Sequence, residues 1–172
     1  MKKPYALVVK AGIITSVLCA ILLTQACVKS STSPTNQPKM TAKVNGNSFS
    51  ADCSANYSNG RLMLVSITIG SPVKEFNIYL GVTAAGTIAL NTNTGAIGTG
   101  NTGVYAEGPS ASSLTDYATD STHTGTMVIT KFDVAAKKVS GTFSFNAIQI
   151  SPNTGTGTVS ITDGAFTDVT WQ

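Results

Sequence analysis

Residues that commonly build enzyme sites are scarce in this chain of 172 residues. It contains one histidine, one tryptophan and three cysteines, and only 11% of its residues are charged. Because a Ser-His-Asp triad needs an imidazole, His123 is the one residue around which a triad could form. A glycine-rich phosphate loop needs a helix after it, and no segment after residue 40 has the 3.6-residue apolar period of a helix. The sequence therefore predicts no catalytic, cofactor-binding or metal-binding residues.

Long hydrophobic runs are also lacking, with one exception near the N-terminus. Ala11 to Leu23 is an uncharged run of 13 residues, preceded by Lys2, Lys3 and Lys10. A helix that spans a bilayer needs about 20 apolar residues. A run of this length behind a positive flank is typical of a secretory signal peptide.

The residues that follow this run indicate how the signal ends. Ala26-Cys27 resembles the bacterial lipobox, in which the cysteine thiol receives a diacylglycerol and the cysteine becomes the new N-terminus. Thr24 stands where a lipobox usually has leucine, and Leu23 is one position earlier. We expect a signal peptide over residues 1–26 and lipid attachment at Cys27. Simple cleavage after a loose small-x-small site and a retained helix remain the alternatives.

Excess positive charge is lacking once the signal is removed. The whole chain has a formal charge of +3, but loss of Lys2, Lys3 and Lys10 leaves eight basic against eight acidic residues. A nucleic-acid-binding protein needs clustered lysine and arginine to neutralise phosphates. The mature chain has no such patch in its sequence, so we expect no nucleic-acid partner.

The cysteines cannot form an internal disulfide in the mature protein. Cys19 leaves with the signal and Cys27 is committed to lipid, so Cys53 is left without a partner. Apolar and polar residues alternate from Phe49 to Tyr57, which places Cys53 on the apolar face of a strand. We interpret it as a small core residue rather than a reactive thiol.

Three parts can be separated by composition. After the signal, residues 27–39 carry the lipidated cysteine and a polar linker with two prolines, too poor in apolar residues to fold. The 12 linker residues after Cys27 would span roughly 19 Å as a flexible coil. Residues 40–172 have the length of one ordinary domain.

That domain is predicted to consist of strands. Short runs of alternating polarity are separated by turns such as Asn45-Gly46 and Ser58-Asn59-Gly60. We place strands at the following positions, among others: up to Val44, Phe49 to Tyr57, Leu62 to Ile69 with Met63, Val65, Ile67 and Ile69 on one face, Phe76 to Leu80, and Gly86 to Leu90. The prediction is an all-β fold, a single antiparallel β-sandwich or flattened meander barrel of roughly 8–10 strands.

The second half of the domain contains one region with few large apolar residues. From Asn91 to Gly125 we expect exposed loops and two short edge strands anchored by Tyr105 and Tyr117. After it we predict a hairpin in which Thr126 to Phe132 pairs with Val139 to Ala147, with a bulge near Ala147. Two closing strands follow, Thr158 to Ile161 and Gly164 to Trp171, and Asp163-Gly164 forms a turn between them.

Several of these segments together resemble a family of small uncharacterised lipoproteins from Bacteroidota, a domain-of-unknown-function family. The residues that carry the resemblance are Ala42 to Gly46, Thr126 to Asp133, Ser140 to Ala147 and Ile161 to Phe166. The resemblance implies a cell-envelope location and an all-β domain, and it implies no activity. Surface-exported members often have acidic residues after the cysteine, which Val28 to Ser31 lacks.

A few polar residues could form a site if the fold brings them together, although no sequence motif joins them. Asp116, Asp120 and His123 are close in sequence, but their spacing matches no zinc or calcium loop. Acid pairs for glycoside hydrolysis could come only from scattered carboxylates: Asp52, Glu75 and Glu107. Asp120-Ser121-Thr122 resembles an O-glycosylation acceptor, and we interpret Trp171 as a core or edge residue rather than a sugar platform.

We therefore expect a lipid-anchored, non-catalytic β domain of the cell envelope, in the outer membrane and facing the periplasm or the surface. The membrane would be its partner through the anchor at Cys27. A glycan, a small apolar ligand or another envelope protein would bind the domain, or the domain would serve as a structural subunit. The alternative is an envelope hydrolase with its site on the loops of residues 91–125.

Overall fold

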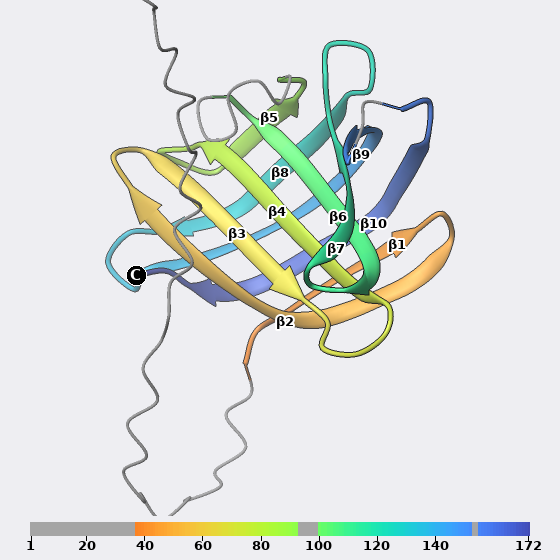
Figure 1. Ribbon diagram of the computed structural model, residues 1–172. Helices are drawn as coiled ribbons and strands as arrows, with labels where there is room; N and C mark the ends of the chain where they lie inside the picture. Colours follow the sequence, from red (N-terminus) through yellow and green to blue (C-terminus); the bar gives the residue numbers. More distant parts are fainter. Residues whose placement is uncertain (1–36, 93–99, 153–154) are drawn as a thin grey trace, which may run out of the picture. The chain divides into compact units, whose positions relative to one another are not determined.

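The computed structural model describes residues 37–92, 100–152 and 155–172, and Figure 1 shows their path. The signal peptide, Cys27 and most of the linker lie outside these residues. Ten strands make up the described part, which contains no helix and so none able to cross a bilayer. The strands are β1 (Lys39–Val44), β2 (Asn47–Ser58), β3 (Arg61–Ile67), β4 (Val73–Gly81), β5 (Gly86–Leu90), β6 (Thr102–Ser110), β7 (Ser113–Ala118), β8 (Gly125–Asp133), β9 (Lys138–Ser151) and β10 (Thr158–Thr170).

Eight of the strands close into a barrel. The hydrogen-bonded order runs β10-β1-β2-β3-β4-β6-β7-β9, and β9 pairs back onto β10, so this ring has no free edge. Strands β8 and β5 continue the sheet from β9, which pairs with β8 along its first half and with β7 along its second half. The expectation of a sandwich is wrong, and the expectation of a barrel is confirmed. Closure of the ring satisfies the backbone groups that edge strands of an open sheet would expose.

Local turn chemistry explains the tight hairpins. Asn45 and Gly46 have φ angles of 47° and 83°, and Asn59 and Gly60 have 52° and 74°. Asparagine and glycine tolerate the left-handed region that a two-residue hairpin turn requires. Both predicted turns are confirmed, together with the flanking strands and the hairpin of β8 and β9.

The predicted turn at Asp163-Gly164 is wrong. Residues 158–170 form one strand, β10, and Asp163 lies in a bulge with a φ of 53°. The register against β9 shifts between Ile161 and Gly164, and again between Phe166 and Val169. Bulges bend a strand and increase its twist, so β10 can follow the curved wall along its full length. In β9 the irregularity lies opposite Asp116 and Tyr117, a few residues beyond Ala147.

The region of residues 91–125 contributes more to the wall than expected. The sequence predicts edge strands only around residues 104–106 and 117–119. Strands β6 and β7 are longer than these segments, and they lie between β4 and β9 instead of at an edge. The end of the sheet order is β5. Tyr105 is fully buried, and Tyr117 is half-buried against the core, so both tyrosines are anchors as predicted.

Aromatic side chains fill the inside of the barrel. Phe76 is fully buried at the centre of the cluster, with its ring centroid 4.7 Å from that of Phe49, 5.1 Å from that of Tyr105 and 5.9 Å from that of Phe143. Gly103 on β6 faces this cluster, and a Cβ atom there would lie 2.9 Å from the Phe145 ring. The interior is therefore a packed core, as in small barrels whose side chains meet at the axis.

Candidate functional site

The predicted lipid-attachment residue, Cys27, lies outside the described residues. The chain that follows it enters the barrel beside β2, where the Cys53 backbone N–H donates a 2.7 Å hydrogen bond to the Pro38 carbonyl. Strand β1 begins one residue later, at Lys39. Any tether from the N-terminus therefore reaches the barrel wall at Lys39.

Cys53 is a core residue, as the sequence predicts. Its side chain points inward from β2 and only 4% of its surface is exposed. Burial raises the pKa of its thiol to about 12. A reactive cysteine needs a nearby cation or helix N-terminus to stabilise the thiolate, and burial has the opposite effect.

This burial predicts that Cys53 resists thiol reagents in the folded protein. At pH 8 we expect alkylation roughly 1,000-fold slower than that of a free cysteine, because the thiolate is the reactive form. The measurement is the rate of iodoacetamide labelling by mass spectrometry, with and without urea. Fast labelling of Cys53 itself, located by peptide mapping of the native protein, would contradict the assignment of Cys53 to the core.

The candidate carboxylates do not form a catalytic pair. Asp52 is exposed and lies 3.4 Å from the Lys39 ammonium group. In β4 and β6, Glu75 is paired with Ala106, and Glu107 follows Ala106 directly. Glu75 and Glu107 therefore project from opposite faces of the wall. Glycoside hydrolysis needs two carboxyl groups flanking one bond, which this arrangement does not provide.

Glu107 instead contacts a core tyrosine. The Tyr105 hydroxyl donates a 2.7 Å hydrogen bond to Glu107 Oε2. Burial and then this hydrogen bond raise the pKa of Tyr105 far above its usual range, so the hydroxyl stays protonated. The contact satisfies the polar end of a buried aromatic residue.

Asp120 and His123 do meet, in a turn after β7. Asp120 Oδ1 lies 3.1 Å from His123 Nδ1 and accepts a 2.7 Å hydrogen bond from the Thr122 backbone N–H. It also accepts the His123 backbone N–H, which is the main cause of the lowered pKa of Asp120. This is the side-chain-to-backbone pattern of an Asx turn, so the carboxylate is occupied in shaping the loop.

The same cluster lacks the other members of a catalytic or metal site. Asp116 belongs to β7 and is not joined to Asp120 or His123, and the described residues contain no group of three potential metal ligands. His123 lines a shallow groove of about 230 Å³ with Asn45, Asn146 and Thr158 to Ser160. Ligand pockets usually have volumes of about 300–1,000 Å³. Asp120 and His123 therefore belong to a polar surface loop whose hydrogen bonds shape the turn.

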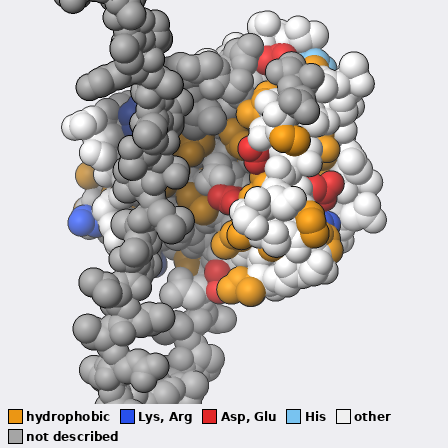
Figure 2. All heavy atoms as spheres, viewed as in Figure 1, with side chains coloured by type: hydrophobic (Ala, Val, Ile, Leu, Met, Phe, Trp, Pro, Cys, Tyr) orange, Lys and Arg blue, Asp and Glu red, His pale blue; other side chains and the backbone are white. Residues whose placement is uncertain are grey.

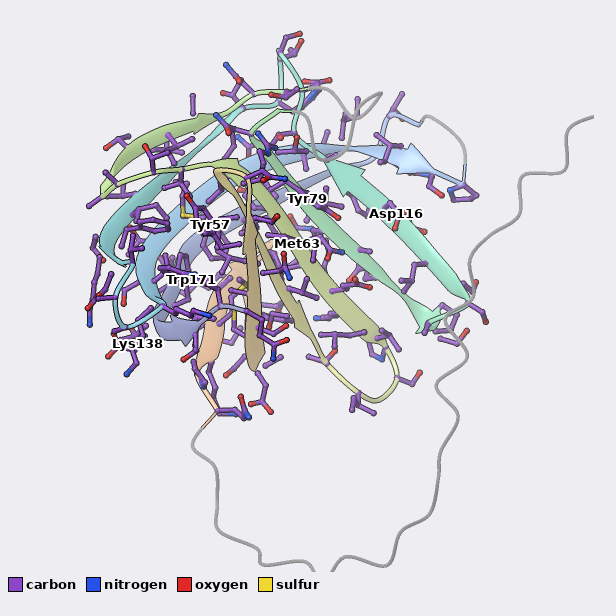
Figure 3. The ribbon with its side chains drawn as sticks, turned by 90° about the vertical axis from the view of Figure 1, so that its left-hand side faces the viewer. Tyr57, Met63, Tyr79, Asp116, Lys138 and Trp171 are labelled. Atoms are coloured by element: carbon purple, nitrogen blue, oxygen red, sulfur yellow. The ribbon has the colours of Figure 1, made fainter. Side chains whose placement is uncertain are left out.

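Trp171 closes the barrel interior at the side where the β8–β9 turn lies. Its ring stacks on Phe132 at 4.8 Å and lies 5.5 Å from Tyr57, with 5% of its surface exposed. Figure 3 shows Tyr57 and Trp171 together there, with Lys138 nearby. A sugar platform needs an open ring face, so Trp171 acts as a core residue, as the sequence predicts.

Apolar side chains also lie on the outer wall of the barrel. Alternation in the sequence shows that they share one face of a strand, but not whether that face points inward or outward. Met63, Val65 and Ile67 do share a face of β3, but that face points outward, because Leu62 and Leu64 are the core residues. Met63 and Val65 line a cleft of about 490 Å³ with Pro38, Ser54, Asn56 and the C-terminal residues Thr170 and Gln172, among others. Figure 2 shows hydrophobic side chains scattered among polar ones on the face in view. Sequence periodicity missed this cleft because its lining includes residues from both ends of the barrel domain, which are distant in sequence.

The fold and its surface define the class of the protein: a closed antiparallel β-barrel with a filled interior, whose accessible features are clefts and turns on the outside. Within that class, the chain belongs to the family described as "Domain of unknown function (DUF6252)", which matches residues 36–170. Comparisons with curated proteins and with solved structures found no match.

Proposed function

We propose that this protein is a lipid-anchored, non-catalytic β-barrel domain of the cell envelope, attached through Cys27. The observation that carries the proposal is the placement of Cys27 directly after the uncharged run of Ala11 to Leu23. Two or three acyl chains on one residue give effectively permanent attachment, since each buried methylene contributes about 0.8 kcal/mol. The resemblance to Bacteroidota lipoproteins supports an outer-membrane location facing the periplasm or the surface.

The proposed role is binding through the outside of the barrel. The aromatic cluster around Phe76 occupies the interior, and a ligand there would have to displace packed rings. A glycan or another envelope protein could instead contact the outer clefts, such as the one lined by Met63 and Val65. The zero net charge of the mature chain supports the absence of a nucleic-acid partner.

A non-catalytic role is supported by the surroundings of the single histidine. His123 Nδ1 contacts Asp120, whose carboxylate also accepts two backbone N–H groups. In a Ser-His-Asp triad the imidazole must also accept a hydrogen bond from the nucleophile. Among the described residues no serine, threonine or cysteine side chain donates to His123.

The test of the anchor is the intact mass of the full protein extracted from membranes with mild detergent. The proposal predicts a chain that begins at Cys27 and carries the added mass of a diacylglycerol group. An unmodified N-terminus, at Cys27 or elsewhere, would overturn lipid anchoring.

A further inference from the structure

Large apolar side chains are exposed at one turn of the barrel, close to where the chain enters it. The turn between β3 and β4 carries Ile69, which is 100% exposed, and Ile67, the last residue of β3, is 42% exposed. We call Ile67, Thr68 and Ile69 the β3–β4 tip. Ile69 therefore contributes nothing to the core, and together with Ile67 it forms an apolar patch on the surface.

Hydrogen bonds hold the tip in place. The Thr68 backbone N–H donates to the Lys74 carbonyl at 2.9 Å, and the Lys74 backbone N–H donates to Thr68 Oγ1 at 2.9 Å. Thr68 Oγ1 also donates to the Lys74 carbonyl at 3.3 Å. The exposed isoleucines are therefore presented by a braced turn, which reduces the entropy lost when the tip meets a surface.

The tip lies beside the tether. Lys39, the first residue of β1, lines the same shallow groove as Ile67 and Ile69, a groove of about 370 Å³. The 12 residues from Val28 to Lys39, where β1 begins, would span roughly 19 Å if they behaved as a flexible coil. A lipid surface at Cys27 would then be within reach of the tip, at the millimolar effective concentration that a short linker gives. Even a weak apolar contact is then populated.

The charges around the tip balance. Lys39 pairs with Asp52 at 3.4 Å, and Ile67 lies opposite Glu75 in the register of β3 and β4, one residue from Lys74. The charges of two lysines, Lys39 and Lys74, are therefore balanced by those of Asp52 and Glu75, so the tip neither attracts nor repels an anionic surface strongly. The contact therefore depends on the isoleucines and should change little with salt.

A third exposed large apolar residue, at another turn, offers a comparison. Val134, 65% exposed, lies in the β8–β9 turn beside Lys137 and Lys138. Figure 1 shows this turn on the opposite side of the barrel from the β3–β4 turn. Only one of the two turns can face the membrane, and the tether enters next to the β3–β4 tip.

We propose that the β3–β4 tip rests on the membrane to which Cys27 is anchored and fixes the orientation of the barrel above the lipid. This inference rests on the proposed lipid anchor. The surface that contacts the tip is then lipid, and binding of a second copy of the chain or of a protein partner at the tip would contradict this.

The test uses full-length acylated protein with one new labelling site. Ser50 is exposed and lines the same groove as the tip, so Ser50→Cys accepts a fluorophore without altering either isoleucine. Ala135→Cys, in the β8–β9 turn, is the matched control, and buried Cys53 stays unlabelled. Both proteins are placed in vesicles of phosphatidylethanolamine and phosphatidylglycerol that contain nitroxide-labelled acyl chains.

We expect several-fold stronger nitroxide quenching at position 50 than at position 135. Adding Ile67→Ser and Ile69→Ser to the Ser50→Cys protein should reduce the quenching to the level of the control. Equal quenching at both positions, or quenching that survives the loss of both isoleucines, would overturn the inference while the anchor stands. Protein that lacks acyl chains and does not float with the vesicles would overturn the anchor itself, and the inference with it.

Discussion

Phe76→Ala is expected to lower the free energy of unfolding by about 3–5 kcal/mol, the usual cost of removing a buried phenylalanine. Phe76 is fully buried, and four aromatic rings surround it: Phe49, Tyr105, Phe143 and Phe145, at centroid distances of 4.7, 5.1, 5.9 and 6.3 Å. These rings come from three different strands, β2, β6 and β9, and cannot all move inward to fill the space. Since domains of this size are stable by only about 5–15 kcal/mol, the variant should approach the unfolding threshold.

The measurement is urea unfolding followed by the fluorescence of Trp171, the single tryptophan, which is buried. Ile69→Ala is the matched control, because a large apolar side chain is removed from a fully exposed position and should change stability by less than about 0.5 kcal/mol. If Phe76→Ala does not fold, Phe76→Leu keeps most of the volume and should cost less than about 1.5 kcal/mol. Equal stabilities of Phe76→Ala and the control would show that the barrel does not depend on this cluster.

The sequence predicts the hairpins of this fold because their determinants are local. Asn45-Gly46 and Asn59-Gly60 can adopt positive φ angles, and alternation on either side identifies the strands. Asp163-Gly164 has the same local chemistry, yet it forms a bulge. The difference comes from β9, where Phe143 pairs with Gly164 and keeps the strand continuous. Nothing within a few residues of Asp163 carries that information.

The same reasoning explains the errors in β6 and β7. A count of large apolar residues underrates them, because small residues in this part of the wall make room for aromatic rings that other strands supply. Gly103 lies against Phe145, which is 42 residues later in the chain. A Cβ atom at position 103 would lie 2.9 Å from that ring. Alternation also cannot decide which face of β3 is the core, since Leu62 to Val65 are all apolar.

The choice between sandwich and barrel depends on long-range pairing as well. Both architectures have alternating strands joined by polar turns, so their sequences look alike. What closes this barrel is the pairing of β9 with β7 on one side and with β10 on the other. Tyr117 pairs with Gln149 across the β7–β9 contact, and no local motif marks either residue.

The candidate site residues likewise include some that local sequence predicts and others that only the fold brings together. Cys53 could be assigned to the core from alternation alone, and the Asp120–His123 contact joins residues three positions apart. The outer cleft brings Pro38 together with Gln172, the two ends of the domain, so it appears only in three dimensions. The exposed isoleucines of the β3–β4 tip belong to an apolar strand face in the sequence, and the fold alone shows that this face points outward.

Cys27→Ser is expected to abolish incorporation of fatty acid into the protein. In the proposed anchor the Cys27 thiol receives the diacylglycerol, and a serine hydroxyl is a far weaker nucleophile near neutral pH. The measurement is metabolic labelling of producing cells with an alkyne fatty acid, followed by detection on the isolated protein. Cys19→Ser and Cys53→Ser are matched controls, and both should keep full labelling.

Each of these three variants removes one thiol, so together they show which cysteine carries the fatty acid. Cys19 lies inside the apolar run and would leave with the signal, and burial raises the pKa of the Cys53 thiol to about 12, so we expect neither to replace Cys27. Labelling that persists in Cys27→Ser and disappears in Cys19→Ser would move the attachment site into the apolar run. The tether would then be eight residues longer by position, and a flexible chain of about 20 residues would span roughly 25 Å, which weakens the coupling of the β3–β4 tip to the membrane.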